Sequence, residues 1–267
     1  MAVWETKQQP LGVIVIVHGS GEHIGRYHWL REKWLNAGFH VVMGDLPGHG
    51  EKAAIRGHID NFKEYLDVIE SWVERASAFR LPICILGHSL GGLAVIRTLQ
   101  ERDLLVTGVM LSSPCLGLKV PVPKWLRAVG AILNRTMPRF LVPTKKSADN
   151  MNATRNLDML RRDAKDTIML KKVSARWYFE LEKAMLLAFE RLDAVPNIPL
   201  LILQGGDDKI VEKNSVKRWF DSLTIENKAY KEWPNLYHEV FNEPEREDVF
   251  QEALKFVKPL QLGGRHK

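Results

Sequence analysis

The chain contains five short hydrophobic runs, and each of the first three is followed by a segment rich in glycine. Residues 13–17, 39–43 and 81–86 are followed by the sequences HGSG, GDLPGHG and GHSLGG. Two later runs cover residues 108–111 and 200–203. Hydrophobic runs of this length with little polar alternation are typical of strands buried on both faces of a parallel sheet. The pattern therefore predicts a central sheet whose strands end at loops able to carry functional groups.

Helical periodicity separates these runs. Hydrophobic side chains recur every three or four positions in residues 61–78, which predicts an amphipathic helix. A last strand over residues 229–233 and a helix from about Asn242, with Pro244 in its first turn, follow towards the end of the chain. Strands that alternate with helices predict an α/β fold, a mostly parallel central sheet flanked by helices and joined by right-handed crossovers.

The alternation stops between residues 116 and 195, where no strong strand is predicted. Hydrophobic positions in residues 125–133 and 174–189 follow helical spacing. The second stretch is hydrophobic on more than one side, so this helix is either enclosed in a core or exposed to an apolar ligand. We therefore predict a core made of residues 1–115 and 196–267, with residues 116–195, the lid segment, inserted as a helical lid.

Composition favours an ordinary globular protein. The chain has 267 residues, of which 45% are hydrophobic and 26% charged. Its hydrophobic stretches are far shorter than the roughly 20 residues that span a bilayer, and its first residues lack the hydrophobic centre of a signal peptide. These features predict a cytoplasmic protein. Cys84 and Cys115 are expected to be buried thiols rather than a disulfide.

Positive charge is concentrated in one part of the chain. The net charge is +6, and residues 115–192 contain 16 Lys and Arg against 7 Asp and Glu. This excess is either a solvated helical surface or a surface for anionic lipid headgroups, which would add a peripheral membrane contact. No nucleic-acid motif accompanies it, so a nucleic-acid partner is not expected. The sequence does not indicate an oligomeric state.

The sequence GHSLGG, residues 87–92, carries the most specific chemical signal. A serine between two glycines at a strand-to-helix corner is the nucleophile-elbow pattern G-x-S-x-G. Such a turn is so tight that side chains at Gly87 and Gly91 would collide with the neighbouring backbone. It exposes the Ser89 hydroxyl beside the unpaired N–H groups that begin the next helix. Ser89 is therefore the candidate nucleophile.

A serine nucleophile needs an acid and a base, and both are expected at the ends of later strands. After residues 200–203 the chain reads GGDD, so Asp207 and Asp208 compete for the role of the acid. We favour Asp208; the alternative for either carboxylate is a turn or a helix cap. His238 follows the last predicted strand and gives the chain order Ser, Asp, His that this arrangement requires.

Two backbone N–H groups are expected to hold the oxyanion. Leu90 directly follows the nucleophile, and Ser20 lies in the early HGSG loop, where Gly19 permits close backbone approach. A plain glycine turn is the alternative for that loop. Histidines, cysteines and carboxylates do not cluster at metal-ligand spacings, so neither a metal nor another cofactor is expected.

Six motifs of the chain carry a family resemblance: HGSGEHIGRY (18–27), GDLPGHG (44–50), RGHIDNF (56–62), GHSLGG (87–92), SSPCLG (112–117) and LQGGDDKIV (203–211). Together they resemble the monoacylglycerol lipase and lysophospholipase group of α/β-hydrolases. The resemblance implies Ser89 as nucleophile, Asp208 as acid and His238 as base, with Ser20 and Leu90 as oxyanion donors, and a helical lid where the lid segment lies. One departure is that the family usually carries a serine two residues after the second glycine of the GDLPGHG motif, whereas here Gly50 is followed by Glu51 and Lys52.

The predicted function is hydrolysis of the carboxylic ester of single-chain acyl lipids, lysophospholipids or monoacylglycerols, through an acyl-enzyme on Ser89. A short-chain carboxylesterase or a serine peptidase on the same fold is the alternative. A non-catalytic receptor or scaffold is a third possibility, although such proteins usually lose a member of the triad. Serine rather than aspartate at the elbow argues against a dehalogenase or an epoxide hydrolase.

Overall fold

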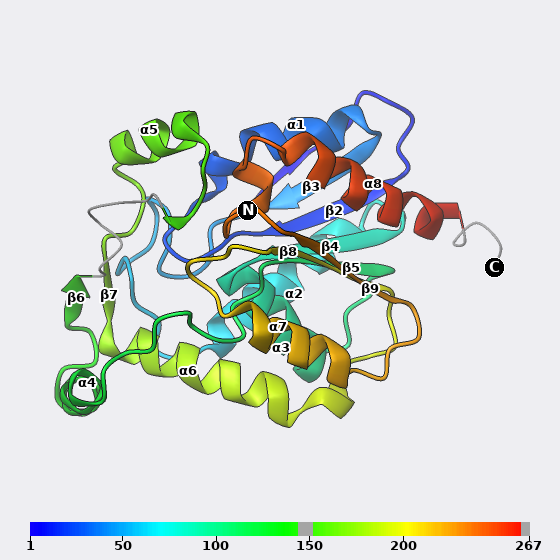
Figure 1. Ribbon diagram of the computed structural model, residues 1–267. Helices are drawn as coiled ribbons and strands as arrows, with labels where there is room; N and C mark the ends of the chain where they lie inside the picture. The colour runs from blue at the N-terminus through cyan, green and yellow to red at the C-terminus, as the bar shows by residue number, and fades with distance from the viewer. Residues whose placement is uncertain (144–151, 263–267) are drawn as a thin grey trace.

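A seven-stranded sheet forms the centre of the computed structural model, which describes residues 1–143 and 152–262 (Figure 1). Neighbouring strands are parallel except for the first, which lies antiparallel at one edge. This edge strand of three residues was not predicted because it is too short to show alternation. The order across the sheet is β1 (Ala2–Trp4), β3 (Phe39–Met43), β2 (Gly12–Val17), β4 (Ile83–His88), β5 (Gly108–Ser112), β8 (Leu200–Gly205) and β9 (Lys228–Trp233).

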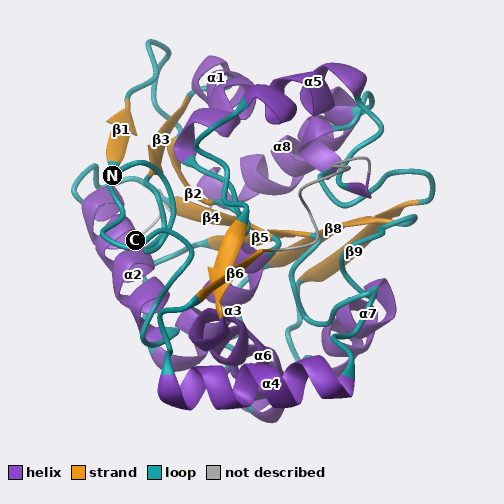
Figure 2. Cartoon of the chain, turned by 90° about the vertical axis from the view of Figure 1, so that its left-hand side faces the viewer, coloured by secondary structure: helices purple, strands orange, loops and turns teal. Residues whose placement is uncertain are grey.

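Helices cover both faces of this sheet (Figures 1 and 2). α1 (His28–Asn36) and α8 (Arg246–Leu262) pack on one face. The other face is covered by α2 (Lys63–Ser77), α3 (Leu90–Glu101), α6 (Ala175–Glu190) and α7 (Lys213–Ser222). Successive residues of β2 alternate between the two hydrophobic clusters, so this strand is buried on both faces. The α/β fold predicted from the alternating runs, a mostly parallel sheet flanked by helices, is thereby confirmed.

The lid segment is more varied than the sequence suggested. It contains α4 (Lys124–Thr136), β6 (Leu141–Pro143), α5 (Leu157–Lys165), β7 (Lys172–Ser174) and α6, followed by the 3₁₀ turn Leu192–Ala194. β6 and β7 form an antiparallel pair that joins positions about 30 residues apart and that local periodicity could not reveal. Four of these elements, α4, β6, α5 and β7, lie at the left of Figure 1.

The two long helices of the lid segment differ in how they join the core. Trp177, Leu181, Ala184 and Ala188 of α6 are buried in the same hydrophobic cluster as the sheet. No residue of α4 is buried, and this helix rests on α6. The helix that the sequence predicted to be hydrophobic on several sides therefore packs into the core on one side, as in the first of the two alternatives, while Leu186 on the same helix is 59% exposed.

The last helix begins later than predicted. α8 starts at Arg246, and Pro244 precedes it instead of lying in its first turn. The chain forms a 3₁₀ turn at Val240–Asn242, and Glu243 is extended and fully buried so that its carboxylate meets Arg155. Cys84 and Cys115 are buried and form no disulfide. None of the described helices is long and hydrophobic enough to span a membrane.

Candidate active site

The end of β4 turns sharply into α3 at Ser89. Ser89 has φ +52° and ψ −115°, a left-handed backbone that non-glycine residues rarely adopt. A side chain on Gly87 would lie 2.7 Å from the carbonyl oxygen of Gly91, and one on Gly91 would lie 2.3 Å from that of Val17. The flanking glycines are therefore required by close backbone packing. The strained turn presents the hydroxyl of Ser89 at the carboxyl end of the sheet.

Asp208 and His238 meet Ser89 at this edge. The Ser89 hydroxyl lies 2.8 Å from Nε2 of His238, and Nδ1 of His238 lies 2.8 Å from Oδ2 of Asp208. All three side chains are buried. With Nδ1 donating to the carboxylate, Nε2 is left to accept the hydroxyl proton, which is the geometry of a serine nucleophile with an oriented base.

The competing carboxylate, Asp207, takes no part in this chain of hydrogen bonds. It is half exposed and paired with Lys209. Oδ1 of Asp208 accepts from the backbone N–H groups of Ile210 at 2.8 Å and Val211 at 2.9 Å. Burial alone would raise the pKa of Asp208, but the adjacent His238 and these N–H groups outweigh it and hold the pKa below its usual value. Asp208 is therefore an anion at neutral pH.

The loops that carry Asp208 and His238 are joined through their backbones. Gly206 N–H donates to the carbonyl of Trp233, and Asp207 N–H donates to that of Leu236, at 2.8 and 3.0 Å. A side chain on Gly205 would lie 2.0 Å from the carbonyl oxygen of Tyr237, the residue before His238. Glycine at this position thus lets the two loops approach closely enough for His238 to reach Asp208.

We expect Gly205→Ala to lower kcat by on the order of 10²-fold, because a displacement of about 1 Å of a catalytic group has that effect. The added methyl group would push the Tyr237 carbonyl and with it His238. Hydrolysis of a short water-soluble p-nitrophenyl ester measures the change. Gly130→Ala is the matched control, because its methyl group would lie 3.5 Å from the Phe179 ring, an ordinary contact. Equal kcat values for the two variants would contradict this role of Gly205.

The two predicted oxyanion donors lie on either side of the nucleophile. Leu90 is the first residue of α3, directly after Ser89. A side chain on Gly19, the residue before Ser20, would lie 3.2 Å from Cβ of Ser89, so this loop passes close to the nucleophile. Within the described residues, the N–H groups of Ser20 and Leu90 make no hydrogen bond to the chain. Gly19 N–H, in contrast, donates to Glu22 at 2.7 Å.

A buried charged cluster behind the triad was not predicted. Arg26 is 4% exposed and contacts Glu22, Asp163 and Glu239. Glu22 fixes the early loop through Gly19, Glu239 follows His238 in the chain, and Asp163 belongs to α5. One buried guanidinium thus connects the loop of Gly19 and Ser20, the loop of His238 and α5 of the lid segment. The cluster was not predicted because Asp163 and Glu239 are far from Glu22 and Arg26 in the chain, and the EHIGRY motif alone does not show burial.

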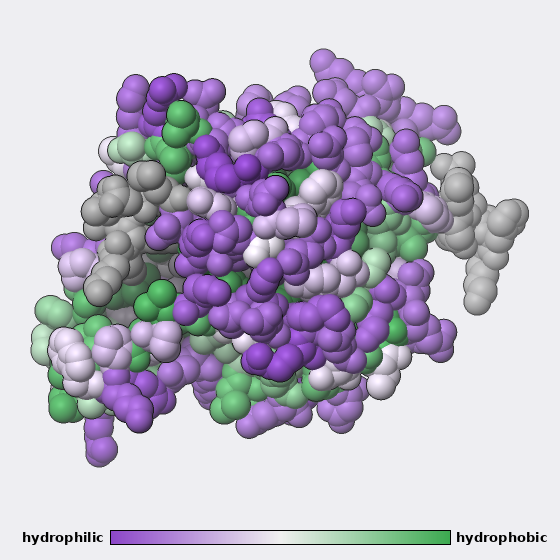
Figure 3. Space-filling view, in the orientation of Figure 1, coloured by the Kyte–Doolittle hydropathy of each residue, from purple (hydrophilic) through white to green (hydrophobic). Residues whose placement is uncertain are grey.

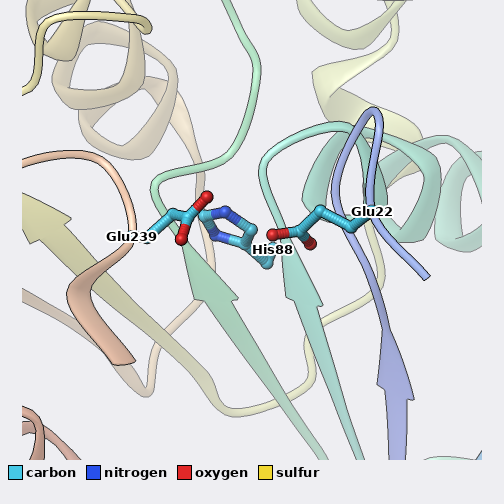
Figure 4. Close-up of side chains that lie close together, drawn as sticks. All are labelled: Glu22, His88 and Glu239. Atoms are coloured by element: carbon cyan, nitrogen blue, oxygen red, sulfur yellow. The ribbon is translucent and has the colours of Figure 1, made fainter. Parts of the chain in front are cut away.

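His88 lies between two carboxylates of this cluster (Figure 4). The potential ligand atoms of Glu22, His88 and Glu239 lie within 4.8 Å of one another. The oxygens of Glu22 already accept from Arg26, Gly19 and Tyr27, and both oxygens of Glu239 accept from Arg26. Arg26 therefore supplies the positive charge that these carboxylates need. The expectation that activity requires no metal stays a prediction.

We expect the free energy of unfolding to fall as the pH is lowered from about 7 to about 4. Burial lowers the pKa of His88 to about 4 and that of His49 to about 3, against an ordinary value of 6.5. In the unfolded chain His88 and His49 bind a proton near pH 6.5, whereas in the folded protein both side chains stay neutral until the pH is much lower. His88 alone therefore accounts for a loss of about 3 kcal/mol in the free energy of unfolding. Urea unfolding at several pH values measures this, and stability that is constant over the range would contradict it.

Comparison with known proteins identifies the family of this fold and site. The Hydrolase_4 sequence profile, described as serine aminopeptidase, S33, matches residues 8–245. The chain belongs to this family. It is 48% identical over 258 residues to Phospholipase YtpA of Bacillus subtilis, covering 96% of this chain and 98% of that protein.

Monoacylglycerol lipases are further relatives within this family. A monoacylglycerol lipase of Mycolicibacterium smegmatis is 28% identical, with 96% of this chain and 91% of that protein covered. The crystal structure of Paleococcus ferrophilus monoacylglycerol lipase superimposes with a TM-score of 0.87 at 31% identity, covering 97% of this chain and 98% of the other. The chain is thus an α/β-hydrolase of the monoacylglycerol lipase and lysophospholipase type, as the sequence motifs predicted.

Proposed function

We propose that this protein hydrolyses the carboxylic ester of single-chain acyl lipids, lysophospholipids or monoacylglycerols, with Ser89 as nucleophile, His238 as base and Asp208 as acid. The observation that carries the proposal is the continuous chain of 2.8 Å hydrogen bonds from Ser89 through His238 to Asp208. The relatives that are named a phospholipase and monoacylglycerol lipases support lipid esters as the substrates.

Each side chain has a defined step in the reaction. Ser89 Oγ attacks the ester carbonyl carbon while His238 Nε2 takes the hydroxyl proton. The N–H groups of Leu90 and Ser20 hold the oxyanion of the tetrahedral intermediate, where each such donor contributes about 3–4 kcal/mol. His238 then gives its proton to the departing alcohol oxygen, which leaves an acyl-enzyme. Water, deprotonated by His238, attacks the acyl carbon and releases the fatty acid and Ser89.

The lid segment, residues 116–195, is proposed as a substrate cover inserted into a core of residues 1–115 and 196–267. Two backbone hydrogen bonds support this, because Leu170 N–H donates to Gly21 and Glu239 N–H donates to Ala153. The segment therefore borders the loops that carry the oxyanion donors and the base. In this proposal α6 is the anchor, since it is buried on the sheet, and α4 is the outer, substrate-facing part.

The outer helix α4 is also proposed to rest on the surface of an anionic membrane. Its hydrophobic side chains Trp125 and Ile132 are 70% and 65% exposed, and hydrophobic residues gather over α4 at the lower left of Figure 3. Lys124, Arg127 and Arg135 lie on the same helix. Exposed hydrophobic residues beside basic ones are the composition of helices that lie in the interface of anionic membranes.

Sedimentation with phosphatidylglycerol vesicles tests this contact. We expect Trp125→Ser combined with Ile132→Ser to weaken binding at least several-fold, because the two side chains lose their burial in the interface. Leu105→Ser is the matched control, since Leu105 is 75% exposed but lies in the loop before β5 and outside the lid segment. Equal loss in both variants would contradict a membrane contact through α4.

A substrate panel tests the proposed activity. p-Nitrophenyl esters with chains of two to sixteen carbons establish acyl preference, and lysophosphatidylcholine, lysophosphatidylglycerol and 1-monooleoylglycerol establish the headgroup. The proposal predicts higher kcat/KM for chains of eight or more carbons than for acetate. Preference for acetate would instead indicate a short-chain carboxylesterase. Cleavage of amino-acid p-nitroanilides without ester preference would indicate the peptidase activity that the family description mentions.

A further inference from the structure

The carboxylate of Asp208 has a fourth hydrogen-bond donor, the side chain of Gln204. Gln204 is part of β8 and is fully buried. Its Nε2 donates to Oδ2 of Asp208 at 3.2 Å and to the carbonyl of Gly205 at 3.1 Å. Oδ2 is the same oxygen that accepts from His238 Nδ1. Gln204 therefore acts on the carboxylate oxygen that orients the base.

The amide of Gln204 can face Asp208 in only one orientation. Both N–H bonds of Nε2 are directed at acceptors, while Oε1 is buried and makes no hydrogen bond among the residues that the structure describes. A flipped amide would place Oε1 against a carboxylate oxygen and a carbonyl oxygen. The flipped amide would also lose the hydrogen bond to a charged group, so the orientation that donates to Asp208 is the favoured one.

Donors surround both oxygens of the acid. Ile210 and Val211 N–H groups point at Oδ1, and His238 Nδ1 and Gln204 Nε2 point at Oδ2. With Nδ1 of His238 protonated and the Gln204 amide in this orientation, a protonated Asp208 would have no acceptor for its own hydrogen among these four partners. Hydrogen bonds to the charged form favour that form, so the surroundings select the carboxylate.

We propose that Gln204 is a positioning residue of the hydrolytic reaction. It keeps Asp208 ionised with Oδ2 aimed at His238 Nδ1, so that Nε2 remains free to take the proton of Ser89. Gln204 acts through Asp208, and within the described residues its side chain forms no hydrogen bond with Ser89 or His238. The inference rests on the triad assignment made under Proposed function and extends it to a residue outside the triad.

The first test is Gln204→Met, which has a similar length and removes both the donor and the unpaired carbonyl. The proposal predicts that kcat falls about tenfold to a hundredfold while KM is unchanged, because a hydrogen bond to a charged group is lost at the acid and no substrate contact is lost. The melting temperature is measured in parallel and is expected to change little. A kcat equal to that of the wild type, or a variant in which only KM changes, overturns the proposal.

The second test is Gln204→Glu, whose introduced carboxyl group donates a hydrogen bond to Asp208 only when it is protonated. Two carboxyl groups that share one site have one strongly raised pKa, so the proton is retained near pH 6. We expect this variant to be several-fold more active than Gln204→Met at pH 6, with the advantage shrinking towards pH 9. No advantage at pH 6, or one independent of pH, overturns the proposal.

Ser89→Ala, measured on the same ester, separates this inference from the proposed function. If Gln204→Met keeps the wild-type kcat while Ser89→Ala is inactive, only the proposed role of Gln204 is wrong. If Ser89→Ala remains active, the assignment of the triad is wrong. If Gln204→Glu fails to fold, the split between kcat and KM in Gln204→Met decides the matter alone.

Discussion

His238→Gln is expected to lower kcat for ester hydrolysis by about 10⁶-fold, the loss that follows when the base of a serine triad is removed. His238 Nε2 lies 2.8 Å from the Ser89 hydroxyl, and among the described residues no other side chain hydrogen-bonds to that hydroxyl. Without the imidazole, Ser89 has no group to accept its proton. Binding and the oxyanion donors remain, so the KM is expected to change far less than kcat.

His28→Gln is the matched control for this substitution, because His28 is exposed on α1 and away from the triad. Initial rates on a p-nitrophenyl ester with a chain of eight carbons measure both variants. Circular dichroism checks that His238→Gln is folded. A folded His238→Gln protein that retains more than about one hundredth of wild-type kcat would contradict the role of His238.

Asp208→Asn is expected to lower kcat by about 10⁴-fold, the effect of the same change in a serine protease triad. The amide would present either a donor to the Nδ1–H of His238 or an oxygen without charge, so the imidazole loses its orientation and the anion that stabilises its protonated form. Four donors converge on the present carboxylate. Each of these donors stabilises a negatively charged carboxylate, and the asparagine amide carries no charge.

Asp207→Asn provides a control at the neighbouring position. Asp207 is half exposed and paired with Lys209, and exposed pairs contribute little to stability. We expect Asp207→Asn to keep kcat within about twofold of wild type, because no contact with His238 is lost. A larger loss in Asp207→Asn than in Asp208→Asn would reassign the acid to the first of the two aspartates.

The sheet could be predicted because hydrophobic runs such as residues 13–17 are buried on both faces and leave a clear pattern. The elbow at Ser89 could also be predicted from the sequence, since tight backbone packing requires glycine on both sides. Choosing Asp208 over Asp207 rested on loop length, and the structure brings Asp208 rather than Asp207 to His238. Its catalytic role, like those of Ser20 and Leu90, stays a prediction.

Features that depend on residues far apart in the chain could not be predicted from the sequence. The charge cluster around Arg26 joins residues up to about 210 positions apart, and nothing local distinguishes Arg26 from a surface arginine. Gln204 follows the predicted strand, residues 200–203, and its role could not be predicted because its interaction with Asp208 exists only once the loop after β8 folds back. The β6 and β7 pair was missed because each strand has three residues.

Labelling with a fluorophosphonate, followed by peptide mass spectrometry, tests whether Ser89 is the nucleophile. We expect one label per chain, located on Ser89 in the peptide that contains GHSLGG, and no label in Ser89→Ala. We also expect labelling to slow strongly in His238→Gln, because the reagent needs the same activated hydroxyl. Label on a different residue, or an intact folded protein that hydrolyses esters yet takes no label at Ser89, would contradict the assignment of Ser89 as the nucleophile.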